Sequence, residues 1–328
     1  MEDLLELYGA LTAPTGPGDL YVARRIDGRQ AYRVAKDSSG NPALLIASQT
    51  SDGIIVPPLE LPNLTFRPRC VCRVQAQGAI ESVETAAVLK CSADDPMLKA
   101  YFLRSVAALL PALPDTPSEN DVAGAVNKLV ELFRALEAPP RTSLQGLWCE
   151  LFLITRASSV RQATFAWHAE PHALHDFSAG RQRVEVKSSV GPIRTHHFRL
   201  DQLLPQQSID VVIASFILEE SGRGTSISEL WEDVSAREEL NPSLRERLLH
   251  VLALCLGRDW RKARRVAFDT EAAANELRLY HTSTIPTVDQ NLPAGVTEVQ
   301  FKAELTNVLP LSRKDVVHRG GLFAAIFG

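Results

Sequence analysis

Residues 175–188 decide the fold, and they read His175-Asp176-Phe177-Ser178-Ala179-Gly180-Arg181-Gln182-Arg183-Val184-Glu185-Val186-Lys187-Ser188. Polar and apolar residues alternate from Arg183 to Lys187, which is the period of a strand with one buried face. Residues 178–180 supply turn residues between this strand and the extended segment before it. The pattern predicts a β-hairpin whose two valines point to one face, with Glu185 and Lys187 on the other.

Two carboxylates converge on this hairpin. Pairing of its strands would bring Asp176 close to Glu185, and like charges at one place repel each other. Protonation or a hard divalent cation with oxygen ligands relieves such repulsion. Lys187 adds a positive donor two residues further on. The hairpin therefore predicts a metal site, although an exposed strand face with cross-strand charge pairs would show the same Glu-x-Lys pattern.

These residues resemble the motif of the PD-(D/E)XK nuclease superfamily, in which an acid, a variable gap and acid-x-Lys lie on neighbouring strands. Asp176 matches the first acid, and Glu185-Val186-Lys187 matches the second part. His175 stands where the motif has proline, a position that shapes the turn and binds nothing. Among members of the superfamily, the chain is most similar to bacterial PD-(D/E)XK motif proteins that accompany restriction and phage-defence genes.

The segments on either side of the hairpin extend the resemblance. Thr142 and Gln145 have capping-box spacing at the start of an expected helix. Glu150 sits at the shoulder of that helix's apolar stripe, where superfamily members often carry an acid that reaches the metal. Its alternative role is that of a solvated surface residue. After the hairpin we expect a short helix over 196–204 and a buried strand over 209–218.

The resemblance implies an α/β restriction-endonuclease-like core, a mixed sheet flanked by helices, over about residues 141–220. It also implies hydrolysis of a phosphodiester, with DNA as the expected substrate and Mg²⁺ or Mn²⁺ as cofactor. Asp176 and Glu185 would hold the metal, and Glu150 would be a further ligand or would contact a metal-bound water. Lys187 would orient the attacking water and offset charge that develops on the phosphorane.

Basic residues gather around the hairpin, and Glu185 is the only acid between residues 181 and 199. Such a surface could hold phosphates, although the net charge of −4 argues against a generally basic coat. The predicted nucleic-acid contacts are Arg181, Arg183, Arg194, His197 and Arg199. A second basic cluster at 258–265 fits either a solvated face or an edge that contacts a nucleic-acid backbone.

The whole chain has 328 residues and is 45% hydrophobic, so the part outside the core has room for further domains. We expect a β-rich accessory domain over 1–92, a helical bridge over 93–140 that packs on the core, and the nuclease-like domain over 141–328 with α/β elaborations at its C-terminal end. The bridge helices are expected at 97–109 and 118–136. A further helix at 243–256 has Asn241-Pro242 before it and Gly257 after it.

Amino-acid composition and sequence patterns indicate the cellular compartment and the candidate partners. Five cysteines without a Cys-x-x-Cys pair indicate reduced thiols in the cytoplasm. The first 20 residues lack the pattern of a signal peptide, and no apolar run approaches membrane-spanning length, so no membrane partner is expected. Cutting both strands of a duplex with one site per chain would call for a homo-oligomer. Other subunits of a defence system are further candidate partners.

Three alternatives stay open. The histidine-rich stretch 168–175 could suggest zinc, but a downstream Pro-Cys-x-x-Cys and an H-E-x-x-H motif are both missing. A catalytically silent relative would use the same basic face to bind nucleic acid or a partner protein. A structural assembly subunit would need no metal.

Overall fold

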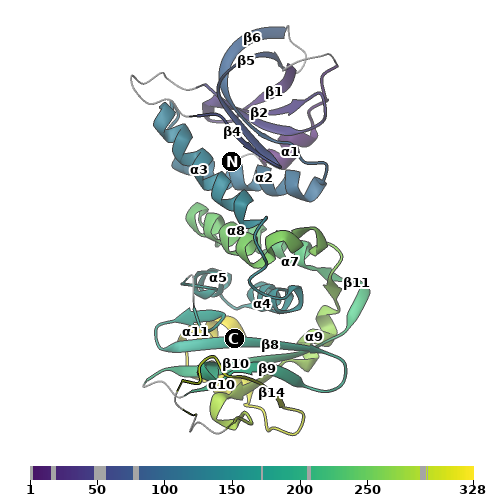
Figure 1. Ribbon diagram of the computed structural model, residues 1–328, viewed down its shortest axis with the longest axis vertical. Coiled ribbons are helices and arrows are strands. Elements are labelled where there is room, and N and C mark those ends of the chain that lie inside the picture. The colour runs from purple at the N-terminus through teal and green to yellow at the C-terminus, as the bar shows by residue number, and fades with distance from the viewer. Residues whose placement is uncertain are drawn as a thin grey trace. The chain divides into compact units, whose positions relative to one another are not determined.

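The computed structural model describes residues 3–15, 20–47, 57–76, 81–170, 173–204, 208–288, 293 and 295–328 (Figure 1). The chain divides into two compact units, Met1–Ala138 and Pro139–Gly328. Each contains both sheet and helix, so the chain is a mixed α/β protein, as the sequence predicts. No helix in the described ranges has both the length and the apolar character that a membrane span requires.

The first unit is built on a sheet in the order β1-β2-β3-β6-β5-β4. Because β1 also pairs in parallel with β5, the sheet curves back on itself. Its inward residues include Tyr21, Ala35, Leu45 and Val88, which pack into one apolar cluster. The strands are β1 (Leu20–Ile26), β2 (Arg29–Asp37), β3 (Pro42–Ile46), β4 (Leu59–Leu61), β5 (Leu64–Ala76) and β6 (Glu81–Cys91).

Helices pack on this sheet. They are α1 (Leu4–Gly9), α2 (Pro96–Leu109), the short 3₁₀ turn η1 (Leu110–Ala112) and α3 (Glu119–Ala135). The side chains of Ser118 and Asp121 form the capping box expected at the start of α3. Helix α2 contacts β3 and β6, and α3 contacts β5. The helices expected as a separate bridge thus lie in the first unit, and whether residues 1–92 fold alone stays a prediction.

The second unit holds the predicted hairpin in a sheet of order β13-β10-β8-β7. Strands β7 (Phe177–Ala179) and β8 (Gln182–Val190) are antiparallel, with Phe177 opposite Val184 and Gly180 at positive φ in the turn. β10 (Asp210–Leu218) runs parallel to β8, with Ile213 opposite Glu185. β13 (Arg278–His281) is antiparallel to β10. The hairpin prediction is confirmed, and the sheet is mixed.

Helices α4 (Leu144–Arg156), α5 (Val160–Ala166) and α11 (Gly321–Phe327) contact the hairpin strands, and α7 (Ile227–Ala236) and α8 (Pro242–Leu256) pack on α4 in turn. Figure 1 shows α4 and α5 between the sheet and the pair α7 and α8. Helix α4 is capped by Ser143, whose hydroxyl accepts from the Gly146 N–H. The spacing of Thr142 and Gln145 therefore marked the start of this helix, but not its capping residue.

A small ladder of β9 (Thr195–Arg199) and β14 (Gln300–Glu304) packs against β10, where Phe198, Val211, Ile213 and Tyr280 form one cluster. The helix expected over 196–204 is therefore wrong over residues 196–199, which belong to β9. Only α6 (Leu200–Leu203) is helical. Local pattern could not show this, because β9 pairs with a strand about a hundred residues further along the chain. The remaining elements are β11 (Glu220–Ser226), η2 (Gly257–Lys262), β12 (Ala267–Phe268), α9 (Thr270–Glu276), η3 (Thr282–Thr284) and α10 (Arg313–His318).

Arg194, predicted as a nucleic-acid contact, is only 1% exposed and holds the fold together instead. Its guanidinium donates to the carbonyl and hydroxyl oxygens of Ser215 on β10, both at 2.8 Å. It also donates to the carbonyl oxygen (2.7 Å) and carboxylate (3.1 Å) of Glu276. The same Ser215 hydroxyl is 2.6 Å from His196 Nε2. A charge buried in this way cannot face a ligand, so that prediction is wrong.

Arg194→Met should lower the free energy of unfolding by about 3 kcal/mol or more, because it leaves buried acceptors without a donor. Urea unfolding measures this change. The matched control is Arg199→Met, which removes an exposed arginine paired with Asp201 and should cost at most about 1 kcal/mol. Equal, small losses in both variants would show that the Arg194 network does not stabilise the fold.

Candidate metal and catalytic site

The hairpin fixes two carboxylates side by side. Asp176 lies just before β7, and its Oδ2 accepts a hydrogen bond from the Val186 N–H at 2.7 Å. Glu185 lies next to Val186 on β8 and is only 3% exposed. Its Oε1 accepts from Lys187 Nζ at 2.7 Å and from Gln202 Nε2 at 2.6 Å. Its Oε2 is buried and has no hydrogen-bond partner among the described residues.

Gln202 links the lysine to this acid. Its side chain, on α6, accepts from Lys187 Nζ at 3.1 Å through Oε1 and donates to Glu185 through Nε2. The backbone N–H of Arg199 donates to the same Oε1 at 3.1 Å, which fixes the amide. Lys187 Nζ also lies 5.3 Å from the centre of the Phe198 ring. The acid-x-lysine pair is therefore held by a residue that the sequence motif does not include.

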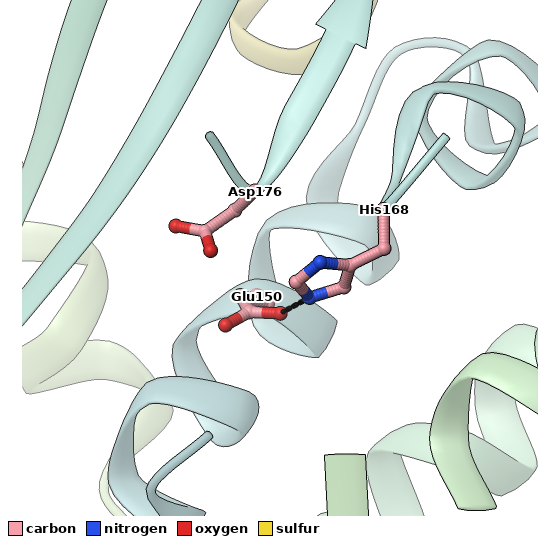
Figure 2. A group of neighbouring side chains, drawn as sticks. All are labelled: Glu150, His168 and Asp176. Carbon is pink, nitrogen blue, oxygen red and sulfur yellow. Dashed lines mark hydrogen bonds and ion pairs between the residues drawn. The ribbon is translucent and has the colours of Figure 1, made fainter. Parts of the chain in front are cut away.

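Glu150 reaches the site from α4 and is 2% exposed, so it is not a solvated surface residue. Its Oε2 accepts from Trp167 Nε1 at 2.7 Å and lies 2.9 Å from His168 Nε2 (Figure 2). Glu150, His168 and Asp176 each offer one ligand atom, and these atoms all lie within 4.8 Å of one another. The structure thus brings two predicted acids together and adds an imidazole.

The backbone after α5 holds His168 in place. His168 has a positive φ of 41°, an uncommon conformation for a residue with a side chain. Its N–H donates to the Asp176 carbonyl at 2.7 Å. Arg247 on α8 donates to the carbonyls of Thr164 (2.7 Å), Trp167 (2.5 Å) and His168 (2.9 Å). These bonds hold the imidazole against Glu150.

Asp176 has a raised proton affinity. Burial, followed by the charges of Glu185 and Glu150, raises the pKa of Asp176 well above its usual range. Burial lowers the pKa of His168, but hydrogen bonds to Cys255 and Glu150 outweigh it and raise that pKa to about 11. His168 is therefore an imidazolium paired with Glu150 at neutral pH.

These features fit a divalent cation. Glu185 has a buried oxygen without a partner among the described residues, and Asp176 resists ionisation beside two other acids. The ligand atoms of Glu150, His168 and Asp176 lie close together. A cation would satisfy the unpaired oxygen and relieve the repulsion. Carboxylates with one imidazole suit Mn²⁺ as well as Mg²⁺. From the histidine-rich stretch suggestive of zinc, only His168 enters this group among the described residues. His175 instead lies 3.1 Å from the Gln202 carbonyl, and residues 171–172 fall outside the described ranges.

The other residues predicted to contact nucleic acid differ in their exposure and in the hydrogen bonds that they already make. Arg183 donates to the carbonyls of Gly180 and Gln182 and so braces the hairpin turn. Arg181 is exposed, with its Nε donating to the Ser208 carbonyl at 2.6 Å. His197 and Arg199 are exposed on β9, where they alternate with buried residues. Contact between these four residues and nucleic acid remains a prediction.

The chain belongs to a PD-(D/E)XK-related family. Residues 4–306 match a family model described as "Putative PD-(D/E)XK family member, (DUF4420)". The match covers both compact units, so the N-terminal unit is part of what defines the family. Comparison with curated proteins and with solved structures gave no match. The family resemblance carried by Asp176, Glu185 and Lys187 is thereby confirmed.

Asp176→Asn should flatten the pH dependence of stability in metal-free protein. Because the folded-state pKa of Asp176 is raised, ionising it costs folding free energy, and stability should fall as pH rises through that pKa. One such group contributes at most about 1.4 kcal/mol per pH unit. Asparagine cannot ionise but can still accept from Val186. Urea unfolding in EDTA across pH measures the difference.

His168 contributes a slope of the same sign, since its stabilisation is complete below its unfolded pKa and is lost as pH rises towards about 11. That contribution remains in Asp176→Asn, so its slope should shrink without disappearing. Asp233→Asn is the control, because that side chain is 49% exposed and pairs only with Arg237 among described residues. If both variants keep the wild-type slope, Asp176 does not carry a raised pKa.

Proposed function

We propose that this protein is a metal-dependent nuclease that hydrolyses phosphodiester bonds, with DNA as its main substrate. The observation that carries the proposal is the buried, unpartnered oxygen of Glu185 beside Asp176, with Lys187 bound to the same carboxylate. A structural charge network would pair that oxygen. The order of α4, the hairpin, α6 and β10 supports a restriction-endonuclease-like core over about residues 141–220.

The roles follow from the contacts. Asp176, Glu150 and Glu185 would hold Mg²⁺ or Mn²⁺, with His168 as a further ligand once it gives up its proton. The ion would supply positive charge to the phosphodiester and lower the pKa of the attacking water. Lys187 would donate to that water and offset negative charge on the phosphoryl oxygens in the transition state. Gln202 would keep the ammonium group directed at the site.

The biological context and the cellular compartment are part of the same proposal. The sequence resemblance adds a restriction or phage-defence context, in which other defence-system subunits would be partners. All five cysteines are buried thiols outside any disulfide, which supports a reducing, cytoplasmic environment. A second function also has an observation in its favour: His168 pairs with Glu150, and Lys187 pairs with Glu185. These pairs partly balance the acids without metal, as a silent nucleic-acid-binding or partner-binding relative would require.

Lys187→Met separates the two functions. The variant should bind Mn²⁺ as tightly as wild type or more tightly, because it loses a like charge, yet its cleavage rate should fall about 100-fold or more. Asp176→Asn should lose metal binding and cleavage together, because it removes a ligand charge. Calorimetric titration with Mn²⁺ measures binding. A nuclease assay on duplex and single-stranded DNA, with an EDTA blank, measures cleavage.

Matched controls are Lys314→Met, whose side chain is exposed, and Asp233→Asn; both should behave as wild type. Thermal melts confirm that every variant folds. Metal binding without cleavage by the wild-type protein would favour the silent relative. If both site variants bind metal and cleave like the controls, the nuclease proposal is wrong.

A further inference from the structure

A groove of about 1370 Å³ lies in the second unit, outside the metal site. It is lined by exposed residues of α5, by the turn of the β7–β8 hairpin, by residues 239–247 around the start of α8, and by residues 319–322. Figure 1 shows α5 between α8 and the sheet. The side chains of Arg161, Gln162 and Phe165 on α5 line the groove. The residues assigned to metal binding and catalysis do not line it.

The groove is basic. Arg161, Arg181, Arg247 and Arg319 line it, and Glu239 is the only acidic lining residue in the described part of the chain. Arg319 is paired with Asp210. The other three arginines form no ion pair with any described residue, and Arg161 and Arg181 are exposed. Uncompensated guanidinium groups along a groove favour a chain of phosphates.

An exposed aromatic ring lies among these charges. Phe165 lines the groove from α5 and is 67% exposed. Burying such a ring against an apolar partner would be favourable, and a nucleobase offers a flat apolar face. Aromatic rings combined with a basic groove are how proteins bind single strands without reading their sequence. Bases inside a duplex are already stacked on their neighbours, so an exposed platform favours an unpaired strand.

The groove adjoins the chain segment that carries His168. Phe165 is three residues before His168, and Arg247 donates from the groove wall to the carbonyls of Trp167 and His168. Both of these residues bond Glu150 in turn.

We propose that this groove binds an unpaired nucleic-acid strand next to the scissile bond, with phosphates on Arg161 and Arg181 and a base on Phe165. The substrate class would then be single strands or the unpaired parts of larger nucleic acids. The inference rests on the proposed nuclease function for the identity of the neighbouring site. Binding in the groove itself requires no metal, so it can be tested separately.

The test is fluorescence anisotropy of the full chain in EDTA, with a labelled single-stranded DNA oligonucleotide and a duplex of the same length. Wild type should bind the single strand more tightly. Arg161→Gln/Arg181→Gln should weaken binding and reduce the slope of log affinity against log salt by about 1.4, or about 0.7 for each lost phosphate contact. Phe165→Leu should weaken binding about fivefold or more, with the salt slope unchanged.

The control pair is Arg134→Gln/Arg223→Gln, which removes the same charge from exposed positions outside the groove. It should keep the wild-type affinity and slope. Equal weakening by both pairs, tighter binding of the duplex, or no effect of Phe165→Leu would each overturn the groove proposal. Groove-dependent binding without metal-dependent cleavage would overturn only the nuclease function. Cleavage with unchanged binding by the groove variants would overturn only the groove.

Discussion

The gathering of Asp176, Glu185 and Glu150 in a space with little water is the constraint on which the rest of the site depends. Each acid needs a donor, and each receives one from a different element. Glu150 is bonded by Trp167 and His168, Glu185 by Lys187 and Gln202, and Asp176 by the Val186 N–H. Burial and the nearby charges of Glu185 and Glu150 raise the pKa of Asp176. A cation would therefore stabilise the site.

The surrounding fold explains how those donors are held. Arg194 ties the start of β9 to β10 and to α9, and β9 leads directly into the helix that carries Gln202. His196 lies in the same buried network, where burial lowers its pKa to about 4. It is therefore neutral at physiological pH and adds no positive charge near Lys187. Arg247 plays a comparable part for the backbone that carries His168.

The sequence predicted what depends on local pattern. Alternation over residues 183–187 and small turn residues indicated the hairpin, and this placed Asp176 beside Glu185. The caps at Asn241 and Gly257 placed α8 within a residue. Family membership could also be predicted, because the sequence contains the acid-acid-lysine motif at the spacing that the family shows. Each of these features depends only on residues that are close in the sequence, within a few helical turns or one hairpin.

What the sequence could not show depends on distant contacts. Gln202 carries no motif, and its role appears only when α6 packs beside β8. His168 stood out as part of a histidine-rich stretch, but its link to Glu150 depends on the path of the chain after α5. Arg194 looked like one of several hairpin arginines until burial against Ser215 set it apart. The strand at 195–199 needed a partner from residues 300–304.

The most direct test of the central claim is anomalous diffraction from crystals grown with Mn²⁺, collected for wild type and for Asp176→Asn. We expect an anomalous peak in wild type bounded by the carboxylates of Asp176, Glu150 and Glu185, and the loss of that peak in the variant. An empty acid cluster at saturating Mn²⁺ in wild type, with Glu185 Oε2 still unpaired, would contradict it.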